Sequence, residues 1–134
     1  MSDAVPVDVG ALRRFLAAEP AVVCATLFGS AQGGSVRPGG DVDIAVLFRG
    51  SRPGAREFLA FYSRLCDAVP TIERVDLVPL NDAHPILAFE AIQGQFLVKN
   101  DPEATAAFFS LVCREYEDVM ADLERQRRLR ASAA

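Results

Sequence analysis

The sequence predicts one α/β domain in which helices cover a small β-sheet. Short apolar runs rich in β-branched residues alternate with stretches whose apolar residues recur at helical spacing, which is typical of an α/β sandwich. The chain has 134 residues, enough for a single domain with its own core and too few for two ordinary ones. Hydrophobic residues make up 51% and charged residues 24%, as in folded globular proteins.

The first part of the chain predicts a helix followed by a buried strand. We expect the residues up to Val7 to form a loose leader. Asp8 can cap a helix over about residues 9–18, which Pro20 ends. Residues 21–28 form a nearly continuous apolar run, typical of a strand that is covered on both faces.

The middle of the chain continues the alternation of strands and helices. Ser30 opens a short helical turn, and a glycine-rich loop with Pro38 follows it. We then expect a strand over 42–48, a helix over 55–68, a strand over 73–79, a helix to about 92 and a strand over 95–99. Asn81 and Asp82 can cap the helix that ends near residue 92.

A long helix is predicted at the end of the chain, after a core that covers about residues 9–99. Asp101 and Pro102 are a strong helix start, and the helix should run to about residues 128–130. At 1.5 Å per residue it is about 40 Å long, more than so small a domain can cover. Its surplus apolar stripe favours a homo- or hetero-oligomeric partner. Four arginines lie in its last turns, namely Arg125, Arg127, Arg128 and Arg130. They are consistent either with a solvated helix end, where cations are favourable, or with a contact with protein or RNA.

Charge and cysteine content restrict the class of protein. The formal net charge of −4 argues against broad nucleic-acid binding, which needs a basic surface. Three cysteines that are far apart in the chain favour free thiols in a reducing compartment. We find neither a signal peptide nor an apolar run long enough to span a membrane, so we expect a cytoplasmic protein.

Two aspartates at the start of the second strand are the main candidates for chemistry. Asp41 and Asp43 are two residues apart, so their side chains should project to the same face while Val42 and Ile44 bury the other. Adjacent carboxylates repel each other, and a divalent cation removes the conflict. Oxygen ligands favour Mg²⁺ or Mn²⁺ over zinc. The alternative is a pair of solvated or loop-capping aspartates.

A third aspartate strengthens the metal interpretation. Asp76 lies in the middle of the strand over 73–79, where we expect burial, and a buried carboxylate requires a partner or a metal. If this strand is a neighbour of the strand over 42–48, Asp76 joins the other two aspartates. The alternative is a salt bridge to Arg74 or Arg37.

Gly29 and Ser30 follow the first strand and complete the candidate site. Glycine lets the backbone approach a ligand closely, and a helix start presents free N–H groups to phosphate. An ordinary turn with a serine cap is the alternative. The stretch is not a Walker loop, because no Gly-Lys-Ser/Thr follows.

Together these residues resemble the minimal nucleotidyltransferases of the DNA polymerase β-like superfamily. That family has Gly-Ser, a spacer, and then Arg-Pro-x-Ser-Asp-x-Asp. The matching residues in register are Gly29, Ser30, Gly34, Arg37, Pro38, Asp41 and Asp43. The resemblance implies a small mixed sheet flanked by helices and a single nucleotidyltransferase domain over residues 1–134. Three positions depart from the pattern: Gly40 replaces the usual serine, Gly33 stands where arginine is common, and Gln32 stands where alanine is common.

The resemblance also implies a reaction. Asp41, Asp43 and Asp76 would be catalytic and would bind Mg²⁺ or Mn²⁺, with ATP as the substrate. Gly29, Ser30, Gly34 and Arg37 would bind the nucleotide, and Asp76 could accept a proton from the acceptor hydroxyl. A single-domain chain of this length with a terminal Asp-Pro-Glu helix looks like the MNT-domain antitoxins of HEPN/MNT toxin–antitoxin pairs. In those pairs, the antitoxin adenylylates a tyrosine of the HEPN ribonuclease toxin.

Three other functions remain as alternatives to protein adenylylation. A catalytically weak or inactive MNT protein would neutralise a toxin by binding alone, which the departures at Gly33 and Gly40 motivate. An aminoglycoside-type small-molecule transferase usually has a second domain, and little chain follows Lys99 here. Templated polymerisation fits the acidic charge poorly. We expect His84, Tyr62 and Tyr116 to be structural, although self-modification of a tyrosine is possible.

Overall fold

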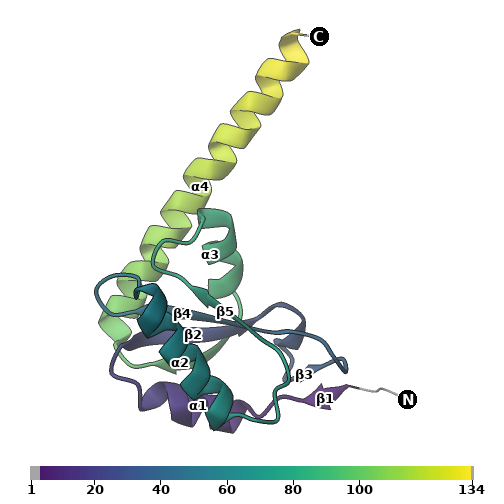
Figure 1. Cartoon of the computed structure of the whole chain (residues 1–134). Coiled ribbons are helices and arrows are strands. Elements are labelled where there is room, and N and C mark those ends of the chain that lie inside the picture. The colour runs from purple at the N-terminus through teal and green to yellow at the C-terminus, as the bar shows by residue number, and fades with distance from the viewer. Residues whose placement is uncertain (1–3, 134) are drawn as a thin grey trace.

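A four-stranded mixed sheet forms the centre of the molecule, and helices cover both of its faces (Figure 1). The computed structural model describes residues 4–133. The strand order is β5-β4-β2-β6, with β4 and β5 parallel and the other neighbours antiparallel. The strands are β2 (Val22–Phe28), β4 (Val42–Phe48), β5 (Val75–Pro79) and β6 (Gln95–Lys99). The helices are α1 (Val9–Ala17), α2 (Ala55–Ala68), α3 (Pro85–Ile92) and α4 (Pro102–Ala133).

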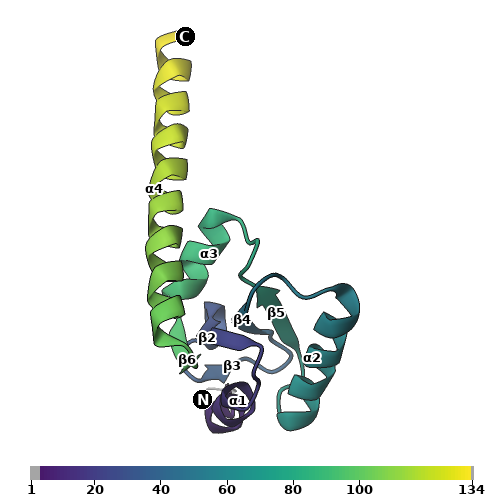
Figure 2. The same ribbon diagram turned by 90° about the vertical axis from the view of Figure 1, so that its left-hand side faces the viewer.

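Two apolar layers hold the helices against the sheet. On one face α1 and α2 bury Leu12, Leu16, Phe61 and Leu65 against the strands. On the other face the core contains Ala88, Ala91 and Ile92 of α3 and Val112 of α4. Strand β4 alternates between the layers, because Val42, Ile44, Val46 and Phe48 join the first and Ala45 and Leu47 join the second. Figure 2 shows α1 and α2 on the side of the sheet opposite α3 and α4.

Strand β2 is buried along its whole length, as its continuous apolar run predicts. Its one polar residue is Thr26, which has no exposed surface. The Thr26 hydroxyl donates a 2.8 Å hydrogen bond to the carbonyl oxygen of Ala91. This bond joins the central strand to the last turn of α3 and therefore helps to hold α3 above the sheet.

We expect Thr26→Val to lower the free energy of unfolding by about 0.5–1.5 kcal/mol, because it removes this hydrogen bond while the Gly94 amide still donates to the Ala91 carbonyl oxygen at 3.1 Å. Valine has nearly the same shape as threonine, so packing should change little. Urea denaturation of the two proteins measures the difference. Ser63→Ala on the exposed face of α2 is the control and should be neutral. An unchanged midpoint for Thr26→Val would show that the Gly94 amide alone satisfies the Ala91 carbonyl and that the threonine bond contributes no stability.

Three details of the fold differ from the expectations. Residues up to Val7 are not all a loose leader: β1 (Val5–Pro6) pairs with β3 (Ser35–Val36), and Val7 is buried, while residues 1–3 lie outside the described part. Helix α3 begins at Pro85, and His84 caps it by accepting a 3.1 Å hydrogen bond from the Ile86 amide at Nδ1. Neither Asn81 nor Asp82 caps this helix.

Helix α4 is longer than expected, because it continues to Ala133 rather than ending near residues 128–130. Its 32 residues correspond to a length of about 48 Å. The helix starts beside β2 and α3 and then projects far beyond the rest of the domain (Figures 1 and 2). Within residues 4–133, no helix combines the length and apolar composition that crossing a bilayer requires.

Candidate active site

The parallel pairing of β4 and β5 brings two of the predicted aspartates side by side. Asp43 and Asp76 are direct register partners, and Asp41 lies one residue before β4. Asp43 alternates with the buried Val42 and Ile44, so its side chain projects to the α3 face of the sheet. The expected burial of Asp76 is wrong: the residue is exposed, because β5 is an edge strand.

Asp43 carries an unfavourable negative charge. Partial burial raises the pKa of its carboxyl group, and the charge and hydrogen bond of Asp76 raise it further. The charges of Asp41 and of Glu90 add to the same shift of the Asp43 pKa. Glu90 belongs to α3 and is 47 positions away in the chain, so no local pattern in the sequence could have placed it here.

The carboxylates around Asp43 have the donor chemistry of a magnesium site. All of its ligating atoms are oxygens, and a cation would relieve the repulsion that raises the Asp43 pKa. Within residues 4–133, however, no three acidic, histidine or cysteine side chains already surround a common point. The Asp41 carboxylate instead faces Arg74 at 3.4 Å from the arginine Nε. Metal binding therefore requires Asp41 to exchange this exposed ion pair for the cation. Arg74 pairs with Asp41 and not with Asp76.

Gly29 fits closely against the Asp43 side chain. The residue begins a 3₁₀ turn over Gly29–Ala31 and has φ of +70°, a conformation that favours glycine. A Cβ atom added at this position would lie 2.3 Å from the Asp43 carboxylate oxygen Oδ2. The absence of a side chain at residue 29 therefore leaves room for the Asp43 carboxylate in its present position.

An open cleft of about 430 Å³ lies beside these aspartates, within the usual size range of ligand sites. Four of the residues that we predicted from the sequence line it, namely Ser30, Arg37, Asp41 and Asp43. Gly34 is not part of the lining. Its φ of +90°, and its hydrogen bonds to Ala31 and Val7, shape the loop that forms the cleft wall.

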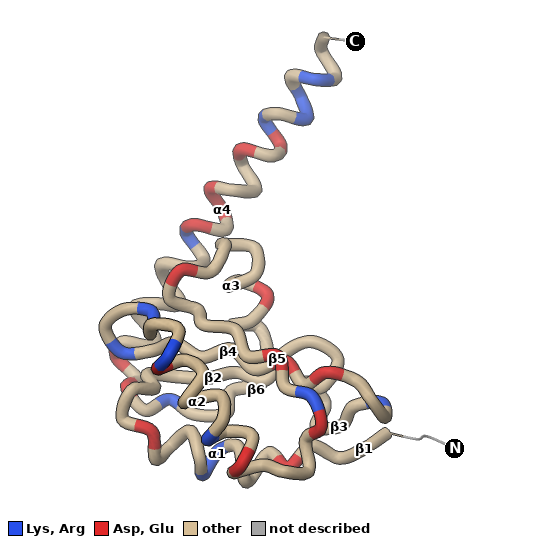
Figure 3. The backbone as a smooth tube through the Cα atoms, in the orientation of Figure 1, with Lys and Arg blue, Asp and Glu red and all other residues tan. Residues whose placement is uncertain are grey.

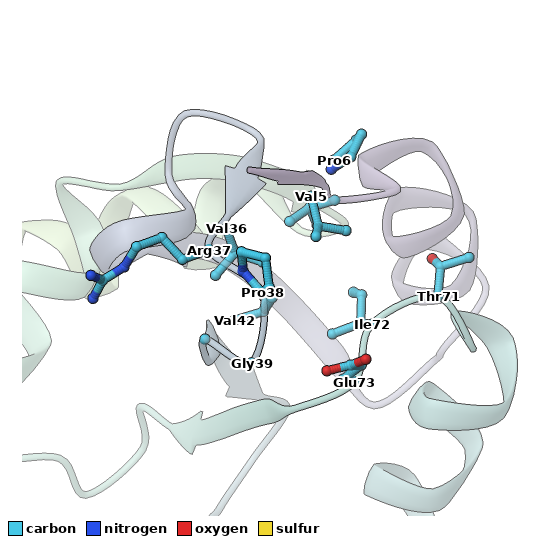
Figure 4. Close-up of a pocket in the computed structure, with 12 residues that line it drawn as sticks. Val5, Pro6, Val36, Arg37, Pro38, Gly39, Val42, Thr71, Ile72 and Glu73 are labelled. Carbon is cyan, nitrogen blue, oxygen red and sulfur yellow. The ribbon is translucent and has the colours of Figure 1, made fainter. Parts of the chain in front are cut away.

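A second, smaller cavity of about 90 Å³ lies behind the same loop (Figure 4). Its walls are of mixed polarity and include Val5, Val36, Pro38 and Ile72, with Glu73 at one side. The Arg37 side chain points away from this cavity. The loop over residues 37–40 thus lies between this cavity and the cleft beside the aspartates.

Gly33 and Gly40, the two glycines that depart from the family pattern, have different surroundings. A Cβ atom at Gly33 would meet nothing within 4 Å. At Gly40 it would lie 2.8 Å from the Val36 Cγ2 atom and 3.0 Å from the Arg37 carbonyl oxygen. The loop therefore has room for a larger residue at position 33 but is built closely around glycine at position 40.

The remaining candidates lie outside the cleft. The Tyr62 hydroxyl donates to the Val75 carbonyl oxygen at 3.2 Å, and the Tyr62 side chain packs against the α1 and α2 layer. Tyr116 stacks on Phe89 with ring centroids 3.8 Å apart. Both tyrosines thus have packing contacts, as the helical spacing indicates. The three cysteines are free thiols.

Comparison with known proteins supports the same fold. A family model described as "Polymerase beta, Nucleotidyltransferase" matches residues 11–103. No curated protein sequence is significantly similar to the chain. Several solved structures have the same fold, and the three described next are of toxin–antitoxin systems.

Three of these structures are informative. A toxin–antitoxin structure with AMP-PNP has a TM-score of 0.72 and 23% identity over 96% of this chain and 100% of the other. The MntA–HepT toxin–antitoxin structure has a TM-score of 0.61 and 23% identity, covering 94% and 93%. A tri-AMPylated Shewanella oneidensis HEPN toxin in complex with its MNT antitoxin gives a TM-score of 0.61 and 24% identity, covering 94% and 92%.

Identities in this range establish the shared fold, while the family match includes most of the residues around the cleft. The match contains the Gly-Ser turn, both aspartates of the Asp-x-Asp motif and Asp76. On these grounds the chain belongs to the polymerase β nucleotidyltransferase family.

Proposed function

We propose that this chain transfers AMP from ATP to a tyrosine of a partner HEPN-type ribonuclease toxin and so acts as its antitoxin. The observation that carries the proposal is the register pairing of Asp43 with Asp76 beside a cleft lined by Ser30, Arg37, Asp41 and Asp43. The nucleotide analogue and the AMPylated toxin in similar complexes support the choice of ATP and of a toxin acceptor.

Each side chain has a defined task in this reaction. Ser30 and the Arg37 guanidinium bind the β- and γ-phosphates of ATP at the cleft wall. Asp41, Asp43 and Asp76 would hold Mg²⁺ or Mn²⁺, which would lower the pKa of the acceptor hydroxyl and offset phosphate charge. The tyrosyl oxygen forms a bond to the α-phosphorus, the bond from that phosphorus to the bridging oxygen breaks, and pyrophosphate leaves. Asp76, exposed beside Asp43, accepts the hydroxyl proton.

Differently labelled ATP tests this proposal directly. The chain is incubated with Mg²⁺ and the protein encoded by the adjacent gene, using ATP labelled either at the α- or at the γ-phosphate. We expect label on the neighbouring protein from α-labelled ATP only, and loss of its ribonuclease activity. Label from the γ-phosphate would indicate phosphorylation instead. No label despite complex formation would contradict the catalytic claim.

A second candidate function is neutralisation by binding alone. The observation that favours it is the Asp41–Arg74 ion pair, which occupies one of the metal-binding carboxylates. On this hypothesis, Asp43→Ala would leave toxin neutralisation in cells unchanged. If the variant stays folded and complexed but no longer neutralises, the binding hypothesis fails and adenylylation is supported.

Restoring the family residues tests the two departures in the loop. We expect Gly40→Ser to lower kcat roughly 10-fold, because its Cβ atom would displace Val36 or the Arg37 backbone at the cleft wall. Gly33→Arg has open space and should lower the KM for ATP by adding a cation for phosphate. Steady-state kinetics of both variants separate the two effects. A rise in kcat for Gly40→Ser would show that only the serine hydroxyl was missing.

A further inference from the structure

The second half of α4 is an unpartnered helix with a partly apolar face. Thr105 and Val112 are the helix's only buried residues between Pro102 and Ala133, and both lie in its first half. The face that contains Val112 continues as Tyr116, Val119, Met120 and Leu123. Leu123 is 48% exposed, although it lies on this apolar face. The segment from residue 117 onward, here called distal α4, projects away from the sheet (Figure 2).

Charges are segregated along this part of the helix (Figure 3). One block is acidic and contains Glu115, Glu117, Asp118, Asp122 and Glu124. The block after it is basic and contains Arg125, Arg127, Arg128 and Arg130. At 3.6 residues per turn, Arg127 and Arg130 fall on the same face as Tyr116 and Leu123. The acidic residues flank that face, with Glu115 and Asp122 on one side and Glu117 and Glu124 on the other.

Contacts within the chain leave much of this charge unpaired. Arg125 pairs with Asp122, and Arg127 and Arg128 both pair with Glu124, all within exposed turns of the same helix. Such exposed pairs contribute little and exchange easily. In the described part of the chain, Arg130, Glu115 and Glu117 have no ion-pair partner. The helix therefore presents separate blocks of opposite charge to an external partner.

We propose that distal α4 pairs in an antiparallel arrangement with distal α4 of a second copy of this chain. In that arrangement, the acidic block of each helix lies beside the basic block of the other. The centre of the paired region falls near Leu123, so the two copies of this exposed side chain meet near the twofold axis. Tyr116 already stacks on Phe89 of α3, so the open part of the face begins at Val119. The aliphatic stem of Arg127 covers this part of the face, and Arg130 reaches the flanking carboxylates.

The charge pattern favours a second copy of this chain, in antiparallel orientation, as the partner of distal α4. A parallel pair of the same helices would place acidic beside acidic and basic beside basic residues, which is unfavourable. The self-complementary pattern needs no other protein. The cleft is lined by residues of η1, β3, β4 and the adjoining loop and by Ala4, so this association leaves the candidate active site accessible. The inference is independent of the adenylylation that we propose.

The oligomeric state of the full chain tests the proposal. We expect sedimentation equilibrium to show a monomer–dimer equilibrium with a Kd on the order of 10–100 µM, as for small interfaces of mixed polarity. The dimer should weaken as salt concentration rises, because charge pairing selects it. A monomer at every concentration in low salt overturns the proposal. A dimer that strengthens with salt also overturns it, because that result indicates a contact between like charges.

Charge-reversal variants provide a sharper test. R127E/R130E makes distal α4 wholly acidic at its apolar face, and E115K/E117K makes its flanks more basic. Each variant alone should be monomeric and remain helical by circular dichroism, whereas an equimolar mixture should restore a heterodimer. The control R52E/R56E changes two exposed arginines outside α4 and should stay dimeric. A mixture that stays monomeric overturns the proposal. A monomeric wild type whose charge-reversal variants lose toxin binding also overturns it, because this face of α4 then binds the toxin instead of a second copy.

Discussion

Replacing Asp43 with asparagine should abolish nucleotidyl transfer while making the protein more stable. We propose that Asp43 is one of three carboxylates that bind the metal, and its loss should then lower kcat/KM by about 10³-fold, equivalent to roughly 4 kcal/mol of transition-state stabilisation. The gain in stability follows because the Asp43 charge is partly buried among Asp76, Asp41 and Glu90. Neutral asparagine avoids both the desolvation and the repulsion. We expect Tm to rise by a few degrees.

The pH dependence of stability follows from the raised pKa of Asp43. Above its ordinary value of 3.8, the folded protein holds a proton on Asp43 that the unfolded chain has released. The charge on Asp43 therefore costs stability at neutral pH, and this cost disappears as pH falls through the raised pKa. The same protonation competes with metal, so Mg²⁺ affinity should fall over that acidic range. Asp43→Asn should remove the contribution of this carboxyl group to the pH dependence of stability and to that of Mg²⁺ affinity.

Differential scanning calorimetry with and without Mg²⁺ measures the change in Tm, and the kinetic assay measures the change in kcat/KM. Mg²⁺ should raise the Tm of the wild-type protein and have little effect on Asp43→Asn. Asp67→Asn, on the exposed end of α2, is the matched control and should leave both Tm and activity unchanged. A lower Tm for Asp43→Asn in metal-free buffer would contradict the proposed repulsion at the site.

Local sequence patterns predicted the elements because each signal lies within a few residues of its effect. Asp8 was expected to cap the first helix, and it does so by accepting a 3.0 Å hydrogen bond from the Ala11 amide. The apolar run of β2 correctly indicated a strand covered on both faces. The fold class and the polymerase β-like resemblance are confirmed by the family match and the similar structures.

Long-range contacts explain where sequence reasoning failed. Asn81 has the chemistry of a helix cap, but its amide group is used elsewhere. It donates to the Phe48 carbonyl oxygen at 2.8 Å and accepts from the Phe48 amide at 3.0 Å, which ties the end of β4 to the loop after β5. His84 caps α3 instead. A partner 33 positions away in the chain decides the role of Asn81, and no local pattern shows it.

The site shows the same limit. The spacing of Asp41 and Asp43 predicted that they lie together, and the pairing of β4 with β5 brings Asp76 beside Asp43, while Asp41 faces Arg74. The exposure of Asp76 depends on β5 being an edge strand, and the contribution of Glu90 depends on how α3 crosses the sheet. Strand order and helix placement are properties of the whole fold. The metal and nucleotide roles of these residues therefore stay predictions, which the variants above test.

Gly29→Ala should damage the site through the position of Asp43 rather than through any lost ligand. The new Cβ atom would lie 2.3 Å from the Asp43 Oδ2 atom, so the carboxylate must move away. The φ of +70° adds backbone strain, and the two effects together should lower the free energy of unfolding by about 1–3 kcal/mol. A displacement of about 1 Å at a metal-binding carboxylate can reduce the rate by roughly 10²-fold.

A double-mutant cycle separates the two causes. Gly33→Ala is the matched control, because its Cβ atom meets nothing within 4 Å, and it should keep nearly full stability and activity. Asp43→Ala removes the carboxylate that the methyl group introduced at position 29 would contact, so Gly29→Ala should cost less stability in that background than in the wild type. The remaining cost then measures the backbone strain alone. If Gly29→Ala costs the same in both backgrounds, its close approach to Asp43 does not determine the geometry of the site, and the backbone conformation of the turn does.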